Sequence, residues 1–112
     1  MGMDRSDYII IGCDISNYLN TMSEEEKDDF DEKYFRRTCD IGDVVHLPDN
    51  YSGKYDFFGI VLDFDPDGFE GLKPFIYREK DYSEQHAKIS KVIQDEFGEI
   101  LEPNLIVLTH WT

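Results

Sequence analysis

The stretch from Tyr55 to Glu70, YDFFGIVLDFDPDGFE, leaves few options for the fold of this chain. Its first half holds five apolar residues between Phe57 and Leu62, rich in aromatic and β-branched types. A strand that is buried on both faces has this composition. Its second half places four carboxylates around Pro66 and Gly68. The stretch therefore predicts a central strand that runs directly into an acidic loop.

Other apolar runs and turn signals divide the rest of the chain. Strands are predicted at residues 7–13, 44–47, 55–64 and 105–108. Helices are predicted at residues 23–37 and 81–97, because each range opens with a capping-box pattern and Gly98 supplies a stop for the second. Turn-forming residues predict a loop over 14–22, and residues 72–77 predict a short extra edge strand.

The resulting order, β-α-β-β-α-β, is that of the ferredoxin-like split βαβ arrangement. We therefore predict an α+β fold with an antiparallel sheet of order 4-1-3-2 and both helices on one face. The two most continuous apolar runs then occupy the two central positions of the sheet. One domain is expected over residues 1–112, since the chain has the length of one modest core.

Composition is that of a folded protein without membrane spans. The chain is 40% hydrophobic and 14% aromatic, which is too rich for disorder. Residues 1–2 ahead of Met3 indicate a cloning remnant or an alternative start. The longest apolar run, residues 8–13, is far shorter than a membrane span, and no signal peptide is visible. Two cysteines, Cys13 and Cys39, do not make a disulfide framework, so a cytoplasmic location is expected.

Charge is the strongest functional signal in the sequence. Twenty-five acidic residues against eleven basic ones give a net charge of −14. So large an excess disfavours nucleic acid, anionic membranes and acidic substrates as direct ligands. It favours a cationic partner, which could be a metal, a basic peptide or a basic surface on another protein.

The acidic residues form two clusters. Seven acids lie between Glu24 and Glu32; at ~1.5 Å rise per residue this is one charge per roughly 1.9 Å, against about 1.7 Å for duplex DNA. With Phe30 facing inward, the other side of this helix would present a phosphate-like row, although a solvated helix with favourable end charges has the same pattern. The predicted partner-binding residues are Glu24, Glu25, Asp28, Asp29, Asp31, Glu32, Asp63, Asp65, Asp67 and Glu70.

No catalytic motif occurs in the chain. In size, acidity, lack of catalytic motifs and α+β layout, the chain resembles small acidic inhibitors encoded by bacteriophages, such as anti-CRISPR and other anti-defence proteins. The resemblance implies a non-enzymatic protein without a cofactor, which blocks a basic, usually nucleic-acid-binding, site on a partner by mimicking DNA.

Metal chemistry has one candidate. The spacing Asp63-x-Asp65-x-Asp67-Gly68 matches the opening of an EF-hand calcium loop, but position twelve is Pro74 instead of glutamate. A calcium-stabilised structural subunit is therefore kept as an alternative. The three histidines, at positions 46, 86 and 110, do not cluster, which disfavours a zinc site or a Cys–His nucleophile pair.

A further alternative is a small enzyme or a ligand-binding homodimer. Its site would lie near Gly12 and Cys13 and the loop 14–22, where a small strand end meets turn-forming residues.

Overall fold

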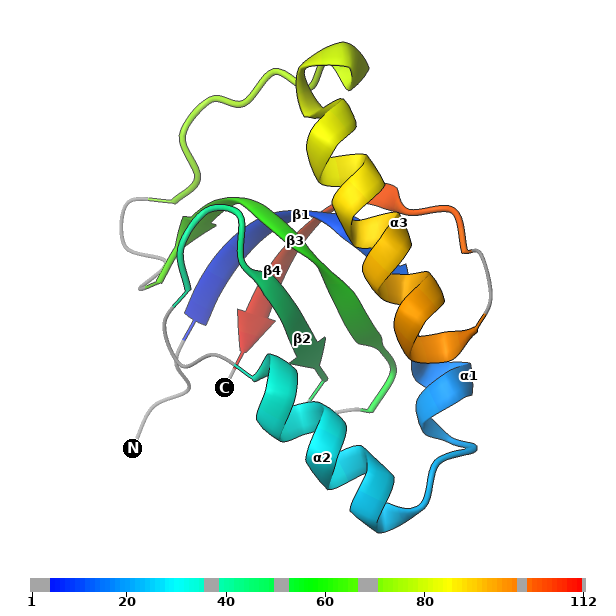
Figure 1. Cartoon of the computed structure of the whole chain (residues 1–112). Coiled ribbons are helices and arrows are strands. Elements are labelled where there is room, and N and C mark those ends of the chain that lie inside the picture. Colours follow the sequence, from blue (N-terminus) through cyan, green and yellow to red (C-terminus); the bar gives the residue numbers. More distant parts are fainter. Residues whose placement is uncertain (1–4, 36–38, 50–52, 67–70, 99–100, 112) are drawn as a thin grey trace.

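A four-stranded antiparallel sheet forms the centre of this computed structural model, which describes residues 5–35, 39–49, 53–66, 71–98 and 101–111 (Figure 1). The sheet order is β2-β3-β1-β4, which is 4-1-3-2 when counted from the opposite edge. All three neighbouring pairs are antiparallel. The strands are β1 (Arg5–Asp14), β2 (Val44–Pro48), β3 (Asp56–Asp65) and β4 (Asn104–Trp111).

Two long helices and two short ones accompany the sheet. They are α1 (Ser16–Leu19), α2 (Glu24–Tyr34), the 3₁₀ turn η1 (Glu79–Tyr82) and α3 (Ser83–Phe97). The capping box of α2 is confirmed, with Ser23 Oγ accepting from the Glu26 amide at 3.2 Å and the Glu26 carboxylate accepting from the Ser23 amide at 3.1 Å. Gly98 ends α3 in the left-handed conformation at φ 73°. Within the described residues, no helix is long and apolar enough to cross a membrane.

The predicted loop 14–22 is wrong in part, because it contains α1. Ile15 and Leu19 are four residues apart and both buried, so one helical turn lets them enter the core together. The Asp14 carboxylate accepts from the amide and the hydroxyl of Ser16, which fixes the start of the turn.

The predicted edge strand 72–77 is also wrong. Residues 71–78 form no strand, and Pro74 offers no amide for a ladder. Leu72, Phe75 and Tyr77 instead pack against the core, and the rings of Phe75 and Tyr77 stack on Tyr82 with centroid separations of 5.7 and 5.5 Å. The second predicted capping box fails too, since Asp81 lies inside η1 and α3 starts without a side-chain cap.

The apolar core lies on both faces of the sheet. On one face α2 and α3 cover the central strands, and the buried residues are Ile9, Ile11, Ile15, Leu19, Phe30, Tyr34, Phe58, Ile60, Leu62, Ile89 and Ile93. On the other face the buried residues are Tyr8, Ile10, Val45, Leu47 and Val61. Side chains from the sheet itself, together with Cys39, pack around this second cluster.

Strands β1 and β3 approach each other most closely at two facing glycines. Gly12 and Gly59 are register partners, and a β-carbon placed on Gly12 would lie 2.1 Å from the Phe58 carbonyl oxygen and 2.6 Å from the Gly59 α-carbon. Only glycine fits such an approach. The small size of Gly12 is therefore explained by strand contact.

Two titratable side chains are buried at the pairing of β1 and β4. Burial alone would raise the pKa of Asp7, but hydrogen bonds from Arg5 and from Thr109 Oγ1 (2.8 Å) hold that pKa below its ordinary value. His110 lies 3.4 Å from Tyr55 Oη, and burial lowers its pKa from the ordinary 6.5. Folding therefore favours neutral His110.

The glycine contact predicts a selective loss of stability. Gly12→Ala should lower the free energy of unfolding by about 3 kcal/mol, because the added methyl meets backbone that cannot move aside. Gly53→Ala is the control, since Gly53 has a positive φ of 66° but no neighbouring atom within 4 Å; it should lower the free energy by only about 1 kcal/mol. Urea unfolding of both variants measures this, and equal losses would contradict the close approach.

The burial of neutral His110 predicts a pH dependence. Below the ordinary pKa of 6.5 the unfolded chain binds a proton that the folded chain resists, so stability falls as the pH falls through this value. The slope should reach up to ~1.4 kcal/mol per pH unit. Urea unfolding across this range should give a flatter profile for His110→Gln and an unchanged one for the control His86→Gln. A His110→Gln profile as steep as that of the parent would refute this origin.

Candidate partner-binding surface

Helix α2 presents an exposed row of carboxylates on the side opposite its buried aromatics. Phe30 and Tyr34 are buried, whereas all seven acidic residues of the helix are exposed. At 100° per residue, four of them fall on the side away from the pair Phe30 and Tyr34, spaced i, i+3, i+4 and i+7. We call this row the α2 stripe: Glu25, Asp28, Asp29 and Glu32.

The charges of the α2 stripe are not neutralised by the rest of the described chain. No ion pair with any of its four carboxylates is present within those residues. The two lysines of the helix face elsewhere: Lys27 lies 3.7 Å from Glu24, and Lys33 lies 2.6 Å from Glu96. Among the described residues, the α2 stripe therefore faces solvent without a basic partner.

Aromatic contacts hold the inner side of α2 against the sheet. The ring of Phe30 lies 5.3 Å from that of Phe58 and 5.7 Å from that of Phe97, and Tyr34 packs on Phe58 at 4.7 Å. These offset and edge contacts add about 0.5–1.5 kcal/mol each to the burial of the rings. The helix is thus fixed by two of its residues while the opposite face stays free.

A histidine bridge ties α2 to two strands. His46 of β2 is buried, with Nδ1 3.0 Å from Asp31 Oδ1 and Nε2 3.0 Å from Asp56 Oδ1. A neutral imidazole has only one N–H, so both contacts are hydrogen bonds only when the ring carries two protons. Both ring nitrogens of His46 therefore face carboxylate oxygens of neighbouring elements.

The carboxylate of Glu96 links α3 to the end of α2. Lys33 Nζ and Tyr34 Oη both donate to Glu96 Oε1 at 2.6 Å. Burial opposes ionisation of Glu96, but these two donors outweigh it and lower its pKa. The pair of contacts fixes the orientation of α2 relative to α3.

The second predicted cluster lies far from the α2 stripe. Asp63 and Asp65 close β3, whereas Asp56, which contacts the histidine bridge, opens it. At ~3.3 Å per residue the two ends of the strand are roughly 30 Å apart. The two clusters therefore do not form one continuous surface, and Asp67 and Glu70 lie outside the described residues.

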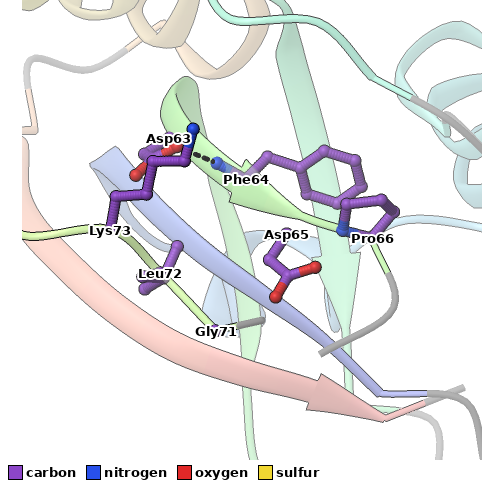
Figure 2. Close-up of a pocket in the computed structure, with 7 residues that line it drawn as sticks. All are labelled: Asp63, Phe64, Asp65, Pro66, Gly71, Leu72 and Lys73. Carbon is purple, nitrogen blue, oxygen red and sulfur yellow. Dashed lines mark hydrogen bonds between the residues drawn. The ribbon is translucent and has the colours of Figure 1, made fainter. Parts of the chain in front are cut away.

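The surroundings of Asp63 and Asp65 form a shallow depression of about 230 Å³ (Figure 2). It is lined by Asp63, Phe64, Asp65, Pro66, Gly71, Leu72 and Lys73. Asp63 accepts from the Phe64 amide at 2.8 Å, and Figure 2 shows the carboxylates of Asp63 and Asp65 pointing in different directions. Among the described residues, no group of three metal-ligating side chains converges. The third residue of the calcium candidate, Asp67, is not among them.

The residues of the alternative site near Gly12 and Cys13 have structural roles. Gly12 faces Gly59, and the Asp14 carboxylate also accepts from the Asp56 amide at 3.3 Å. Burial, together with the neighbouring Asp14, raises the pKa of Cys13 to about 11. The thiol is therefore protonated at neutral pH and is a poor nucleophile.

The histidine bridge was missed by sequence reasoning, which treated His46 only as a failed metal ligand. Fifteen residues separate it from Asp31 and ten from Asp56, so no local spacing marks the group. The one available signal was the alternation of β2, which places His46 on the face that α2 covers.

Comparison with known proteins identifies no relative. No family model matches the chain, and neither the curated proteins nor the solved structures contain a significant match.

The histidine bridge predicts that neighbouring acids of α2 differ in their effect on stability. Asp31→Ala should lower the free energy of unfolding by about 1 kcal/mol, because it removes a charge-assisted hydrogen bond to the buried His46 ring. This value is kept small because Asp31 is exposed and solvent screens the interaction. Asp29→Ala, the same chemical change two residues earlier in the helix, should alter the free energy of unfolding by less than about 0.5 kcal/mol. Urea unfolding at neutral pH distinguishes them, and equal effects would rule out a stabilising bridge.

Proposed function

We propose that this chain is a non-enzymatic binding protein whose α2 stripe occupies a basic, nucleic-acid-binding site on a partner protein and blocks it. In this role it resembles phage-encoded anti-defence inhibitors of the anti-CRISPR type. The observation that carries the proposal is the unneutralised row of Glu25, Asp28, Asp29 and Glu32 on a helix anchored through its other side.

The spacing of the α2 stripe supports mimicry of nucleic acid. Its four carboxylates are spread over seven residue steps, or about 10.5 Å of helix axis. The mean spacing is therefore one charge per roughly 3.5 Å. One strand of duplex DNA carries a phosphate every 3.4 Å along the axis. The individual steps along the axis are about 4.5, 1.5 and 4.5 Å, so the mean spacing, though not each step, matches the interval that a groove lined with arginine and lysine meets on one DNA strand.

The rigidity of α2 also supports this role. The helix is fixed by its capping box, by Phe30 and Tyr34 and by the histidine bridge, so little further ordering is needed on binding. Preorganised charge of this kind raises association rates and lowers the entropic cost of the complex.

Two positive observations favour binding over catalysis. The pKa of each thiol, Cys13 and Cys39, is raised to about 11, first by burial and then by nearby aspartates. Both nitrogens of His46 face carboxylates. Cys13, Cys39 and His46 are thus poorly suited to act as the nucleophile or base of a small hydrolase or transferase.

We also infer a ferredoxin-like βαββαβ fold and a cytoplasmic site of action. The strand order, the antiparallel pairing and the packing of α2 and α3 on the same face support the fold. The two cysteines are unpaired and pack on opposite faces of the sheet, which suits a reducing compartment.

The proposal predicts a charge-specific interaction. A stripe variant combines Glu25→Gln, Asp28→Asn, Asp29→Asn and Glu32→Gln. A control variant removes the same charge from exposed acids of η1 and α3, by Glu79→Gln, Asp81→Asn, Glu84→Gln and Asp95→Asn. The immobilised parent should retain nucleic-acid-binding proteins from a bacterial lysate at low salt and release them to duplex DNA. The stripe variant should bind a purified captured protein at least about fourfold more weakly, since four exposed pairs at about 0.2–1 kcal/mol each give at least about 0.8 kcal/mol.

The control variant should bind that protein within about threefold of the parent, and the dissociation constant of the parent complex should rise steeply with salt. Binding that is indifferent to ionic strength, or equal weakening in both variants, would exclude the α2 stripe as the contact surface.

A further inference from the structure

Strand β4 forms an open edge of the sheet. It pairs with β1 on one side and is the last strand in the order β2-β3-β1-β4, so its other side meets no strand within the described residues. Its eight residues keep an unshifted register with β1 from Asn104 to Trp111. The amide and carbonyl of every second residue therefore point outward in a row that no bulge interrupts.

The side chains of β4 leave apolar surface exposed beside this edge. Val107 is 62% exposed and Leu105 is 38% exposed, although their register partners in β1, Ile9 and Ile11, are buried under the helices. The helices thus cover the central strands on this face but stop short of β4. A long apolar edge of this kind is a ready template for pairing with another strand.

The charge pattern identifies what fits this edge. Residues 104–111 contain no aspartate, glutamate, lysine or arginine, in a chain that carries a net charge of −14. The strand also lacks the inward charge, internal proline or bulge with which proteins usually protect an edge. A strongly acidic chain can approach another copy of itself only where charge is missing, and β4 is such a place.

We infer that β4 is a self-association surface, on which the β4 strand of a second copy pairs antiparallel to give one continuous eight-stranded sheet. Identical strands meet in this way about a twofold axis, so Val107 of each copy lies near the axis at the middle of the strand. Backbone hydrogen bonds and the exposed Leu105 and Val107 of both copies form the contact.

The size and charge of this contact set its strength. One paired strand and its neighbouring side chains bury less than the ~1,200 Å² of a standard stable interface, so the dimer is weak and depends on concentration. Two chains of like charge also repel, and salt screens that repulsion. Dimerisation therefore strengthens with salt, which is opposite to the salt dependence of binding to a basic partner.

Sedimentation equilibrium of the full chain over a wide concentration range, in ~0.5 M salt, tests this inference. The parent should approach twice the monomer mass, whereas Val107→Lys should remain monomeric. Ile41→Lys is the matched control, because Ile41 is 71% exposed and precedes β2, the opposite edge of the sheet; it should dimerise as the parent does. A parent that stays monomeric, or equal effects of the two lysines, would overturn the inference.

A mixing experiment guards against a folding artefact in the variant. Val107→Lys and Val107→Glu should each be monomeric alone but should dimerise when mixed, because opposite charges then meet near the axis. Failure of the mixture to dimerise would overturn the antiparallel pairing. Neither result depends on the α2 stripe, and monomeric Val107→Lys should keep its affinity for a basic partner if the proposed function is correct.

Discussion

The contact between β1 and β3 supports every other part of this structure. Gly12 and Gly59 let the two backbones approach where a single β-carbon would collide, and the residues around them are buried alternately on both faces. Ile10 is fully buried on one face, and Ile11 is 1% exposed on the other. A slip of one residue would exchange the two faces along the whole strand. The sheet therefore has one register, and the platform on which α2 and α3 pack is fixed by it.

Different residues of helix α2 stabilise the fold and carry charge at the surface. Phe30 enters the core, Asp31 binds His46, and Glu32 faces solvent, so three consecutive positions do three different jobs. Seven carboxylates on one short helix repel one another, and at i,i+4 spacing each such pair is unfavourable. The capping box, the acid-rich first turn and the aromatic anchors offset this repulsion. The proposed function would give this exposed charge a use that offsets its cost in stability.

Local signals in the sequence predict the elements well and the long-range contacts poorly. The apolar runs of β1 and β3 predicted the two central strands, and Ser23, Glu26 and Gly98 marked helix ends, because these effects act within a few residues. The apolar residues around Pro74 predicted a strand, because their packing partners, such as Tyr82, could not be identified from the sequence. The Asp31–His46–Asp56 bridge joins three elements and could not be seen in any spacing. The exposure of all six predicted acids of α2 followed from helix periodicity, whereas their distance from Asp63 and Asp65 depended on the fold.

The acidic and the neutral surfaces lie at opposite edges of the sheet. Helix α2 packs beside β2, and β4 is the last strand from β2 in the order of hydrogen-bonded neighbours. Pairing through β4 would therefore leave both α2 stripes free, because no residue of the stripe belongs to the β4 edge. Two linked stripes can engage a basic surface that repeats, as in a partner that is itself a dimer, and the second contact then forms at high effective concentration. High salt favours the dimer but weakens each stripe contact, so two-site binding would be strongest at an intermediate ionic strength.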